Sequence, residues 1–207
     1  MSSAFAVFDY LFIVNSLGER LGSAAGGEVH LFAYLACLLS LLDGQPSAEW
    51  GYAFSGLEMG SPFSADLYES AEELERLGML RPVNAGFLLT DSGTERLIQL
   101  ESLEFFRPRL KYLVPSCQSL LAFPVGMIRN AMSMEPGLRP VIRAGGSRPL
   151  LGETTLEQLH EYREALTRAL GKTADLLVPA TVWLKYLSDK AAQNDAAKMS
   201  LTLVPTT

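Results

Sequence analysis

The chain has 207 residues, of which 48% are hydrophobic and 19% are charged, and its formal net charge is −6. This composition excludes an intrinsically disordered protein, and the length allows one sizeable domain with an appended helical piece. The two cysteines, Cys37 and Cys117, stand in apolar runs without a Cys or His at ligand spacing. We therefore expect two small buried thiols and neither a disulfide nor a zinc cluster.

We expect a soluble, cytoplasmic protein without a membrane segment. The apolar N-terminal stretch has no preceding Lys or Arg and contains Asp9, which is untypical of a signal peptide. The longest apolar run, residues 29–42, has 14 residues and is too short to span a bilayer. This run instead predicts a buried helix.

Charge is distributed unevenly along the chain. Residues 1–104 carry 4 basic and 15 acidic side chains, a net charge of −11, whereas residues 105–150 carry 7 basic side chains and one acid, Glu135, a net charge of +6. Residues 151–207 carry 6 basic and 7 acidic side chains. Such segregation indicates a surface that meets a charged partner, and a solvated basic face without a ligand is the alternative.

Two helices are predicted in the first part of the chain. Apolar residues spaced three to four apart predict a helix over 5–21, and the glycines of 22–27 interrupt it. An apolar helix follows over 28–42 and ends at Asp43-Gly44-Gln45-Pro46. Ser47 then begins a short helical turn and a loop.

The next segment has the features of a helix followed by a wing. Ser64 is placed to cap an acidic helix over 64–79, which Gly78 ends. The string RPVNAGFLLTDSG predicts two short strands with Asn84-Ala85-Gly86 at the tip of the hairpin. Thr90 or Asp91 then caps a further helix to about Glu104.

These elements predict the fold class: a mainly α protein with a single winged-helix-like domain, a two-strand wing and a helical C-terminal extension. The expected divisions are an N-terminal helix and linker over 1–27, the winged-helix-like domain over 28–104, a helical extension with a basic loop over 105–192, and a flexible tail over 193–207.

Prolines divide the helical extension into short pieces. We predict helices near 109–122 and 124–134, followed by a basic loop over 139–152. The capping box Thr154-x-x-Glu157 predicts the start of a helix that continues to Leu170. A last helix is expected over about 173–192.

No group of side chains predicts catalysis, and we expect no catalytic, metal-binding or cofactor-binding residues. His30 stands in an apolar helix, where a core or boundary position is expected, and His160 stands in a charged helix, where an exposed position is expected. Neither has the neighbours of a zinc site. The sequence also lacks a G-x-S-x-G elbow and a phosphate-binding loop. We therefore predict a protein that is not an enzyme and has no small-molecule substrate.

The predicted reading helix is unsuited to DNA. Helix 64–79 carries five acids against the single Arg76, a net charge of −4. Duplex DNA presents about one negative charge per 1.7 Å, so this face repels it. We therefore expect the winged helix to dock protein rather than read bases.

The chain resembles the small middle components of bacterial ABC three-component systems, including the small subunit of Lamassu-type anti-phage systems. The resemblance covers roughly residues 28–135 and rests on the apolar helix VHLFAYLACLLSLL, the approach EWGYAFSGLEMGSPFSADL, the acidic helix ending in Leu-Gly-Met-Leu, and the wing ending in FLLTDSG. Small winged-helix subunits of condensin-like complexes look similar too, although they usually carry two winged helices in tandem.

The resemblance implies a non-catalytic adaptor that accompanies an SMC-like ABC ATPase and an effector, commonly a nuclease. Two other functions stay open: a winged-helix regulator of the PadR or MarR kind, and another small interaction protein such as a toxin–antitoxin-related factor.

Two sets of residues are candidates for contact with partners. The first set is expected at a subunit interface and comprises Glu72, Glu73, Phe105, Phe106, Arg107, Arg109 and Lys111. The second set is expected to contact DNA within the complex, or an acidic partner, and comprises Arg129, Arg139, Arg143 and Arg148. Arginine suits both tasks because its planar guanidinium binds carboxylates and phosphates through two hydrogen bonds.

Overall fold

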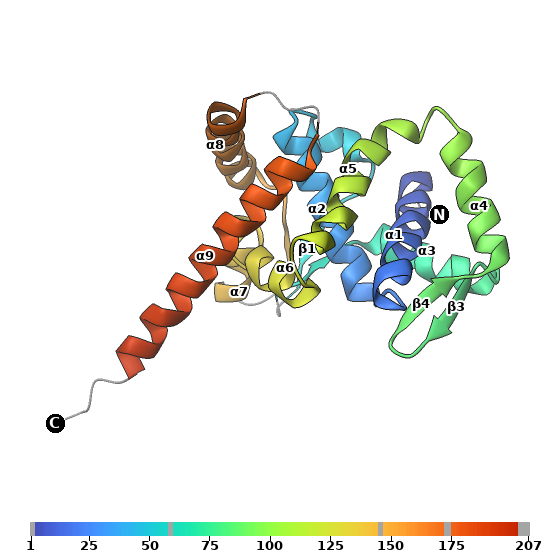
Figure 1. Ribbon diagram of the computed structural model, residues 1–207, viewed down its shortest axis with the longest axis horizontal. Coiled ribbons are helices and arrows are strands. Elements are labelled where there is room, and N and C mark those ends of the chain that lie inside the picture. The colour runs from blue at the N-terminus through green and yellow to red at the C-terminus, as the bar shows by residue number, and fades with distance from the viewer. Residues whose placement is uncertain (1–2, 58–59, 145–146, 172–174, 203–207) are drawn as a thin grey trace.

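The computed structural model describes residues 3–57, 60–144, 147–171 and 175–202, with side chains described except at 143–144 and 195–202. It is mainly helical, with short antiparallel strands in two small sheets (Figure 1). This confirms the predicted mainly α class. Among the described residues, no helix combines the length and the hydropathy needed to cross a membrane.

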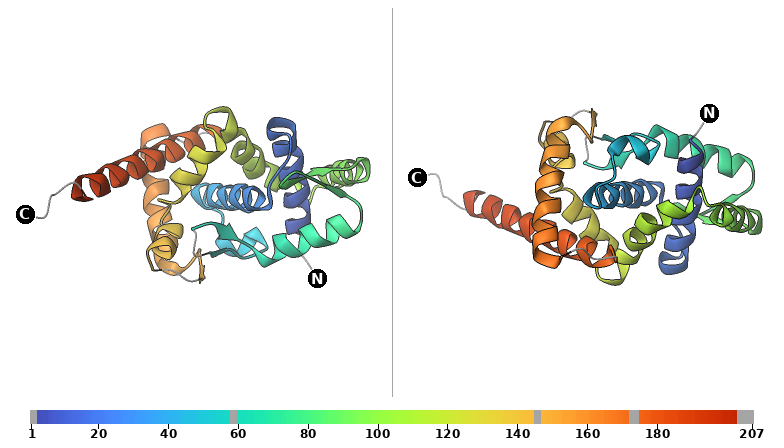
Figure 2. Two further views of the ribbon diagram at one scale, coloured as in Figure 1. Left: turned by 90° about the horizontal axis from the view of Figure 1, so that it is seen from below. Right: turned by 90° about the horizontal axis from the view of Figure 1, so that it is seen from above.

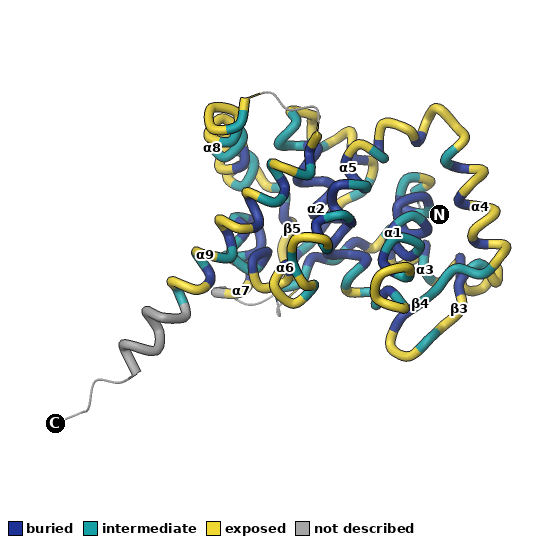
Figure 3. Tube along the Cα trace, viewed as in Figure 1, coloured by how far each residue is buried: buried dark blue, intermediate teal, exposed yellow. Residues whose placement is uncertain are grey.

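The helix α2 (Gly26–Leu42) is the centre of the molecule (Figure 2). Its side chains are buried almost all round the helix because α1 (Ala4–Leu21), α5 (Arg107–Gln118) and α8 (Glu153–Leu170) surround it (Figure 3). A helix that is apolar on every face requires such complete cover. The helices α1 and α2 lie where the sequence predicts them, over 5–21 and 28–42.

The segment after α2 contains strands that the sequence does not predict. The turn η1 (Ser47–Trp50) is followed by β1 (Ser55–Gly56) and β2 (Pro62–Phe63). A third strand, β5 (Arg148–Pro149), pairs antiparallel with β1 and lies at the edge of this sheet. Strands of two residues have no readable period, and their pairing joins distant parts of the chain.

The predicted helix, hairpin and helix are confirmed as α3 (Ala65–Arg76), β3 (Leu80–Val83) with β4 (Gly86–Leu89), and α4 (Asp91–Ser102). Asn84 takes the left-handed φ of 54° that a tight hairpin needs. Thr90 rather than Asp91 caps α4, because its hydroxyl accepts a hydrogen bond from the Gly93 N–H at 3.2 Å. A further bridge pairs Ala24 with Phe87, so the chain before α2 extends the hairpin.

Ser64 precedes α3 as predicted, but its hydroxyl makes no capping bond. Its backbone N–H instead donates to Nδ1 of His30 at 3.0 Å. His30 is therefore a buried histidine that joins the central helix to the start of α3, as its apolar surroundings suggest.

The C-terminal part contains α5 (Arg107–Gln118), η2 (Ser119–Leu121), α6 (Val125–Met132), α7 (Leu138–Ala144), α8 (Glu153–Leu170) and α9 (Leu177–Thr202). The last helix packs on α6 and α5, and α8 packs on α2. The predicted short helices near 109–122 and 124–134 correspond to α5 and α6.

Three predictions for this part are wrong. The expected loop over 139–152 contains α7 and β5. The expected capping box does not form, because Gly152 occupies the N-cap position and Thr154 lies in the first turn of α8. The last helix, expected to end near residue 192, continues as far as Thr202, since the alanines in this segment are strong helix formers. Residues 203–207 of the expected tail lie outside the described residues.

A buried ion pair joins the N-terminal helix to the C-terminal half. Asp9 in α1 and Arg109 in α5 are 0% and 6% exposed. The guanidinium donates twice to the Asp9 carboxylate, once through Nε at 2.7 Å, and its third nitrogen donates to the Trp50 carbonyl at 2.8 Å. The Tyr52 hydroxyl also donates to Asp9 at 2.6 Å. Each guanidinium nitrogen and both carboxylate oxygens therefore make at least one hydrogen bond, as buried charges require.

Aromatic rings enclose this ion pair. The Arg109 guanidinium carbon lies 3.9 Å from the centroid of Trp50 and 4.6 Å from that of Phe5. Although burial by itself lowers the pKa of Arg109, the adjacent Asp9 carboxylate more than compensates and raises it. The side chain thus stays charged, and a cation inside an aromatic shell gains further stabilisation.

We predict that Asp9→Ala lowers the free energy of unfolding by about 3 to 5 kcal/mol, because the substitution leaves the Arg109 charge buried without its partner. The double variant Asp9→Leu with Arg109→Met should recover most of this loss, since no charge is then buried. Urea unfolding followed by circular dichroism measures both.

Lys185→Ala provides the control, because Lys185 pairs with Asp189 on the exposed surface of α9. Its cost should stay within about 0.5 kcal/mol. A cost for Asp9→Ala as small as that of the control would contradict the assigned role of the buried pair.

Candidate functional site

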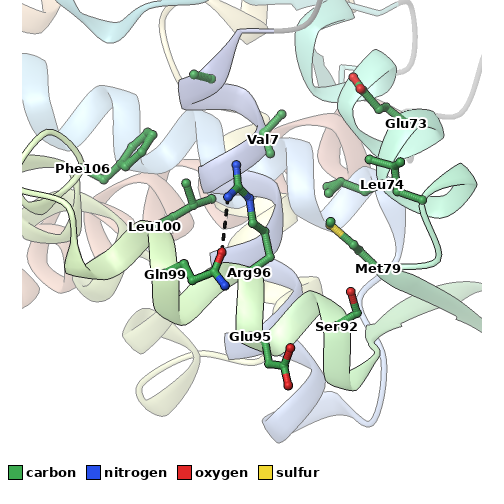
Figure 4. Close-up of a pocket in the computed structure, with 12 residues that line it drawn as sticks. Val7, Glu73, Leu74, Met79, Ser92, Glu95, Arg96, Gln99, Leu100 and Phe106 are labelled. Atoms are coloured by element: carbon green, nitrogen blue, oxygen red, sulfur yellow. Dashed lines mark hydrogen bonds between the residues drawn. The ribbon is translucent and has the colours of Figure 1, made fainter.

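A groove lies between α3 and α4 and is bounded by the first turn of α1 (Figure 4). Its volume is about 540 Å³. The buried side chains of Leu74, Leu100 and Phe106 form its floor. Glu95 and Arg96 of α4 stand on its exposed rim. An apolar floor with a charged rim suits an amphipathic segment of another protein.

The sequence places these side chains through the period of α3. Leu67, Ser70 and Leu74 face inward, whereas Glu72 and Glu73 are exposed. Both glutamates therefore lie on the solvated face where the sequence predicts them, and Glu73 also lines the groove. Arg76 approaches Glu73 at 3.9 Å, a contact too exposed to neutralise the acidic face.

Leu77 is the apolar residue at the rim that sequence analysis missed. It lines the groove and is 48% exposed. Leu77 follows the last residue of α3, where the helix no longer covers its side chain. Its position at the end of the helix is the sequence feature that could have indicated its exposure. A single exposed leucine is common on protein surfaces, so Leu77 is of interest only because it adjoins the apolar floor of the groove.

The two adjacent phenylalanines have different environments. Phe105 is 61% exposed and stacks on Phe5 with ring centroids 4.7 Å apart. Phe106 is 4% exposed and stacks on Phe8 at 4.7 Å. The prediction that both lie at a subunit interface is therefore wrong for Phe106, which is a core residue, while Phe105 is free to contact a partner.

The three basic residues of α5 also differ in their environments. Arg109 was expected at an interface, and this is wrong because its guanidinium is held inside the molecule by Asp9. Lys111 is partly exposed, and its ammonium group lies 2.5 Å from the Asp43 carboxylate. Arg107 is exposed. Burial of every third or fourth residue of α5 against α2 explains the difference, since Arg109 faces the core side of the helix.

The second set of arginines is spread over three elements. Arg129 in α6 is exposed and lies 3.7 Å from Glu28, and Arg148 is exposed on β5. Arg139 in α7 is half-buried. Arg143 also belongs to α7, but its side chain lies outside the described residues. The single basic loop of the prediction is thus divided between a helix and an edge strand.

Glu135, the one acid of the basic segment, is fully buried. Its Oε2 accepts hydrogen bonds from the Gly137 and Leu138 N–H groups, each at 2.9 Å, and from the Tyr34 hydroxyl at 3.2 Å. Oε1 has no hydrogen-bond partner. The carboxylate therefore begins α7 and fastens it to the central helix. Sequence analysis noted only its charge; its isolation among arginines was the available signal.

Burial shifts the pKa values of two groups in opposite directions. Loss of solvation raises the pKa of Glu135 to about 7, despite hydrogen bonds that act against this. Loss of solvation lowers the pKa of His30 to about 4. At neutral pH His30 is uncharged, and its Nδ1 serves as the acceptor for Ser64.

The described residues contain no group of three or more His, Cys, Asp and Glu side chains arranged to hold a metal ion. Cys37 and Cys117 are free and buried, as predicted, and burial raises the pKa of both thiols. His160 is exposed, as predicted, and lies 3.4 Å from Glu164.

Comparison of the chain with protein-family models, with curated proteins and with solved structures finds no match. The resemblance to ABC three-component systems therefore stays a prediction, and the geometry described above is the basis for any functional proposal.

We predict opposite pH dependences of stability for two variants. Glu135 has a folded pKa above its ordinary value of 4.5, so its contribution to stability is lost as pH rises from 4.5 through 7. His30 has a folded pKa below its ordinary value of 6.5, so its contribution is lost as pH falls from 6.5 through 4. In the native chain the two effects offset one another between these values.

When the pH is raised from 5 to 7, the free energy of unfolding of Glu135→Gln should increase by about 2 kcal/mol relative to that of the native chain. The reason is that only the contribution of His30 remains in this variant. In His30→Gln only the contribution of Glu135 remains, so the free energy of unfolding should decrease by a similar amount, relative to the native chain, over the same rise in pH. Urea unfolding at a series of pH values gives the slopes. Parallel profiles for the two variants would rule out this assignment.

Proposed function

We propose that residues 4–102 form a winged helix in which α1 is the first helix. The strand residue Ala24, α2, α3 and the hairpin β3–β4 then follow in the order of that motif. The pairing of Ala24 with β4, and of β4 with β3, supports this assignment. The packing of α1 on α3, α4 and β4 supports it as well, since a separate N-terminal linker would not contact them.

We further propose that the chain is a non-catalytic adaptor whose winged helix docks another protein at the groove between α3 and α4. The observation that carries this proposal is the groove itself, an apolar hollow beside the exposed carboxylates of α3. The same carboxylates disfavour DNA, because α3 carries five acids against the single Arg76 and its net negative charge would face the phosphates.

The partner that we propose is an SMC-like ABC ATPase, which the adaptor couples to an effector such as a nuclease. This identity rests on the resemblance to ABC three-component systems. The groove adds a chemical criterion: the docking segment should be an amphipathic helix with basic residues at its edges, which complement Glu73 and Glu95. The exposed ring of Phe105 and the exposed Arg107 are available for a second contact.

For the remaining arginines we propose contact with the DNA backbone inside the assembled complex. Arg148 and Arg139 are the described members of this set without an ion pair, whereas Arg129 is paired with Glu28. Phosphate contacts carry no sequence information, so the contribution of these side chains should be independent of sequence.

We predict that Glu72→Lys with Glu73→Lys weakens binding to the proposed partner, an SMC-like ABC ATPase, measured by co-purification and by titration of the isolated partners. Both side chains are exposed, so the change in the free energy of unfolding should stay within about 0.5 kcal/mol. Unaltered assembly would count against α3 as the docking face. Sequence-specific binding of a palindrome by the native chain would instead favour the transcriptional regulator.

We predict that Leu77→Arg also weakens this complex, because it places a charge at the apolar rim of the groove. Ile98→Arg is the matched control: Ile98 is 60% exposed on α4 and does not line the groove. Equal losses for both variants, or no loss for either, would show that the groove is not the contact.

We predict that Arg139→Glu, Arg143→Glu and Arg148→Glu together lower the affinity of the assembled complex for DNA at all sequences and leave the assembly intact. Electrophoretic mobility shifts at several salt concentrations measure the first effect, and size-exclusion chromatography without DNA measures the second. Loss of assembly without DNA would identify a protein contact in place of the proposed one.

A further inference from the structure

A second cavity of about 540 Å³ lies on another part of the molecule, where the turn between α6 and α7 meets α8 and α9. None of its lining residues belongs to the groove between α3 and α4. The proposed docking at the groove between α3 and α4 does not use this cavity, although one of its lining residues, Arg139, belongs to the set proposed above for contact with DNA.

Two cations line this cavity. Arg139 of α7 makes no ion pair or side-chain hydrogen bond with another described residue, and it is half-buried. Lys190 of α9 donates to the neutral hydroxyl of Tyr162 at 3.4 Å and stands over the ring of Tyr186, 4.4 Å from its centroid. Neither cation forms an ion pair with a carboxylate of the described residues, although the exposed Glu161 also lines the cavity.

The ammonium group of Lys190 is fixed in place by aromatic side chains. The side chain of Tyr186, followed by that of Tyr162, raises the pKa of Lys190 above its ordinary value against the opposing effect of burial. Tyr162 and Tyr186 contact each other edge to face at 5.8 Å and thereby join α8 to α9. A cation held by neutral hydroxyls and rings keeps its attraction for an external anion.

The remaining lining residues are of both kinds. Met134, Pro136 and Pro140 are apolar and come from the turn before α7 and from α7 itself, whereas Gln158 and Glu161 of α8 are polar. The volume lies within the range of about 300 to 1,000 Å³ that is usual for small-ligand sites. A ligand that contacts both the cations and the rings of this cavity would have a phosphate group, which binds the cations, and a planar ring, which packs on the tyrosines and prolines.

We propose that the cavity between α7, α8 and α9 binds a nucleoside phosphate, with the phosphate on Arg139 and Lys190 and the base against the tyrosine rings. The same chemistry is available from a free nucleotide and from the phosphorylated end of a nucleic-acid strand. The ligand is bound and not converted, because no nucleophile with an adjacent base lines the cavity.

The test is isothermal titration of the full chain with AMP, ATP, adenosine, inorganic phosphate and an oligothymidylate with and without a 5′-phosphate. We expect AMP or ATP to bind, with adenosine and inorganic phosphate weaker by at least about tenfold. Tighter binding of the 5′-phosphorylated oligonucleotide than of the mononucleotides identifies a strand end as the ligand, and the reverse order identifies a free nucleotide.

The variant Arg139→Gln with Lys190→Gln should lower the affinity at least about tenfold, because charged hydrogen bonds to the phosphate are lost. Tyr186→Leu should also lower the affinity for the nucleotide, because the contact with the base is lost; since Tyr186 also holds Lys190, the weak binding of inorganic phosphate should decrease as well. Lys185→Gln is the matched control, since it removes one positive charge from α9 outside the cavity and should leave the affinity unchanged.

Thermal unfolding of each variant establishes that the fold is retained. No heat of binding for any nucleotide or oligonucleotide at about 1 mM ligand would overturn the proposal. It would also be overturned by nucleotide binding that survives the double substitution in a folded protein, or by inorganic phosphate that binds as tightly as AMP. Failure of these experiments leaves the docking proposal untouched, because the two cavities share no residue.

Discussion

The ion pair between Asp9 and Arg109 is the constraint on which the arrangement of the molecule depends. Its partners come from the first and the fifth helix, and the guanidinium also holds the carbonyl of Trp50 between them. Desolvation of two charges is costly, so this contact is favourable only when every hydrogen bond is made. The position of α1, of the turn η1 and of α5 is therefore specified together. With these elements fixed, α2 is enclosed and the floor of the groove is completed by Phe106.

The separation of charge along the chain has a structural counterpart that is less simple than the sequence indicates. The acids of α3 share one exposed face, because a helix of that length with an apolar stripe can present its charges only outward. The basic residues do not form one surface. Arg109 is buried, Lys111 and Arg129 have partners within the chain, and Arg139 lines a cavity. Fewer basic side chains are therefore available to an external partner than the net charge of the segment suggests.

Two buried polar contacts fasten the central helix to its neighbours. His30 accepts from the backbone at the start of α3, and the Tyr34 hydroxyl donates to Glu135 at the start of α7. Both contacts lie one turn apart on α2, and each orients the helix that carries a proposed function: α3 with its acidic face, and α7 with Arg139. A buried polar group has few alternative partners, so such contacts define one arrangement of the helices.

Local sequence patterns determined much of the fold. Apolar spacing gave α1 and α2, acids and leucines alternating with a helical period gave α3 and its exposed Glu72 and Glu73, and the Asn84 hairpin followed from backbone preferences. These features depend on residues a few positions apart, so one sequence is sufficient to predict them. The docking role of α3 follows from the same pattern and remains a proposal.

Only the tertiary structure decided which polar residues are buried and which lie together. Arg107 and Arg109 are alike in sequence, yet one is exposed and the other is enclosed by rings from α1 and η1. The pairing of β1 with β5, the burial of Glu135 and the approach of Arg139 to Lys190 likewise join segments that are far apart in the chain. Such contacts depend on how helices pack rather than on local propensity, and a single sequence carries no local signal for them.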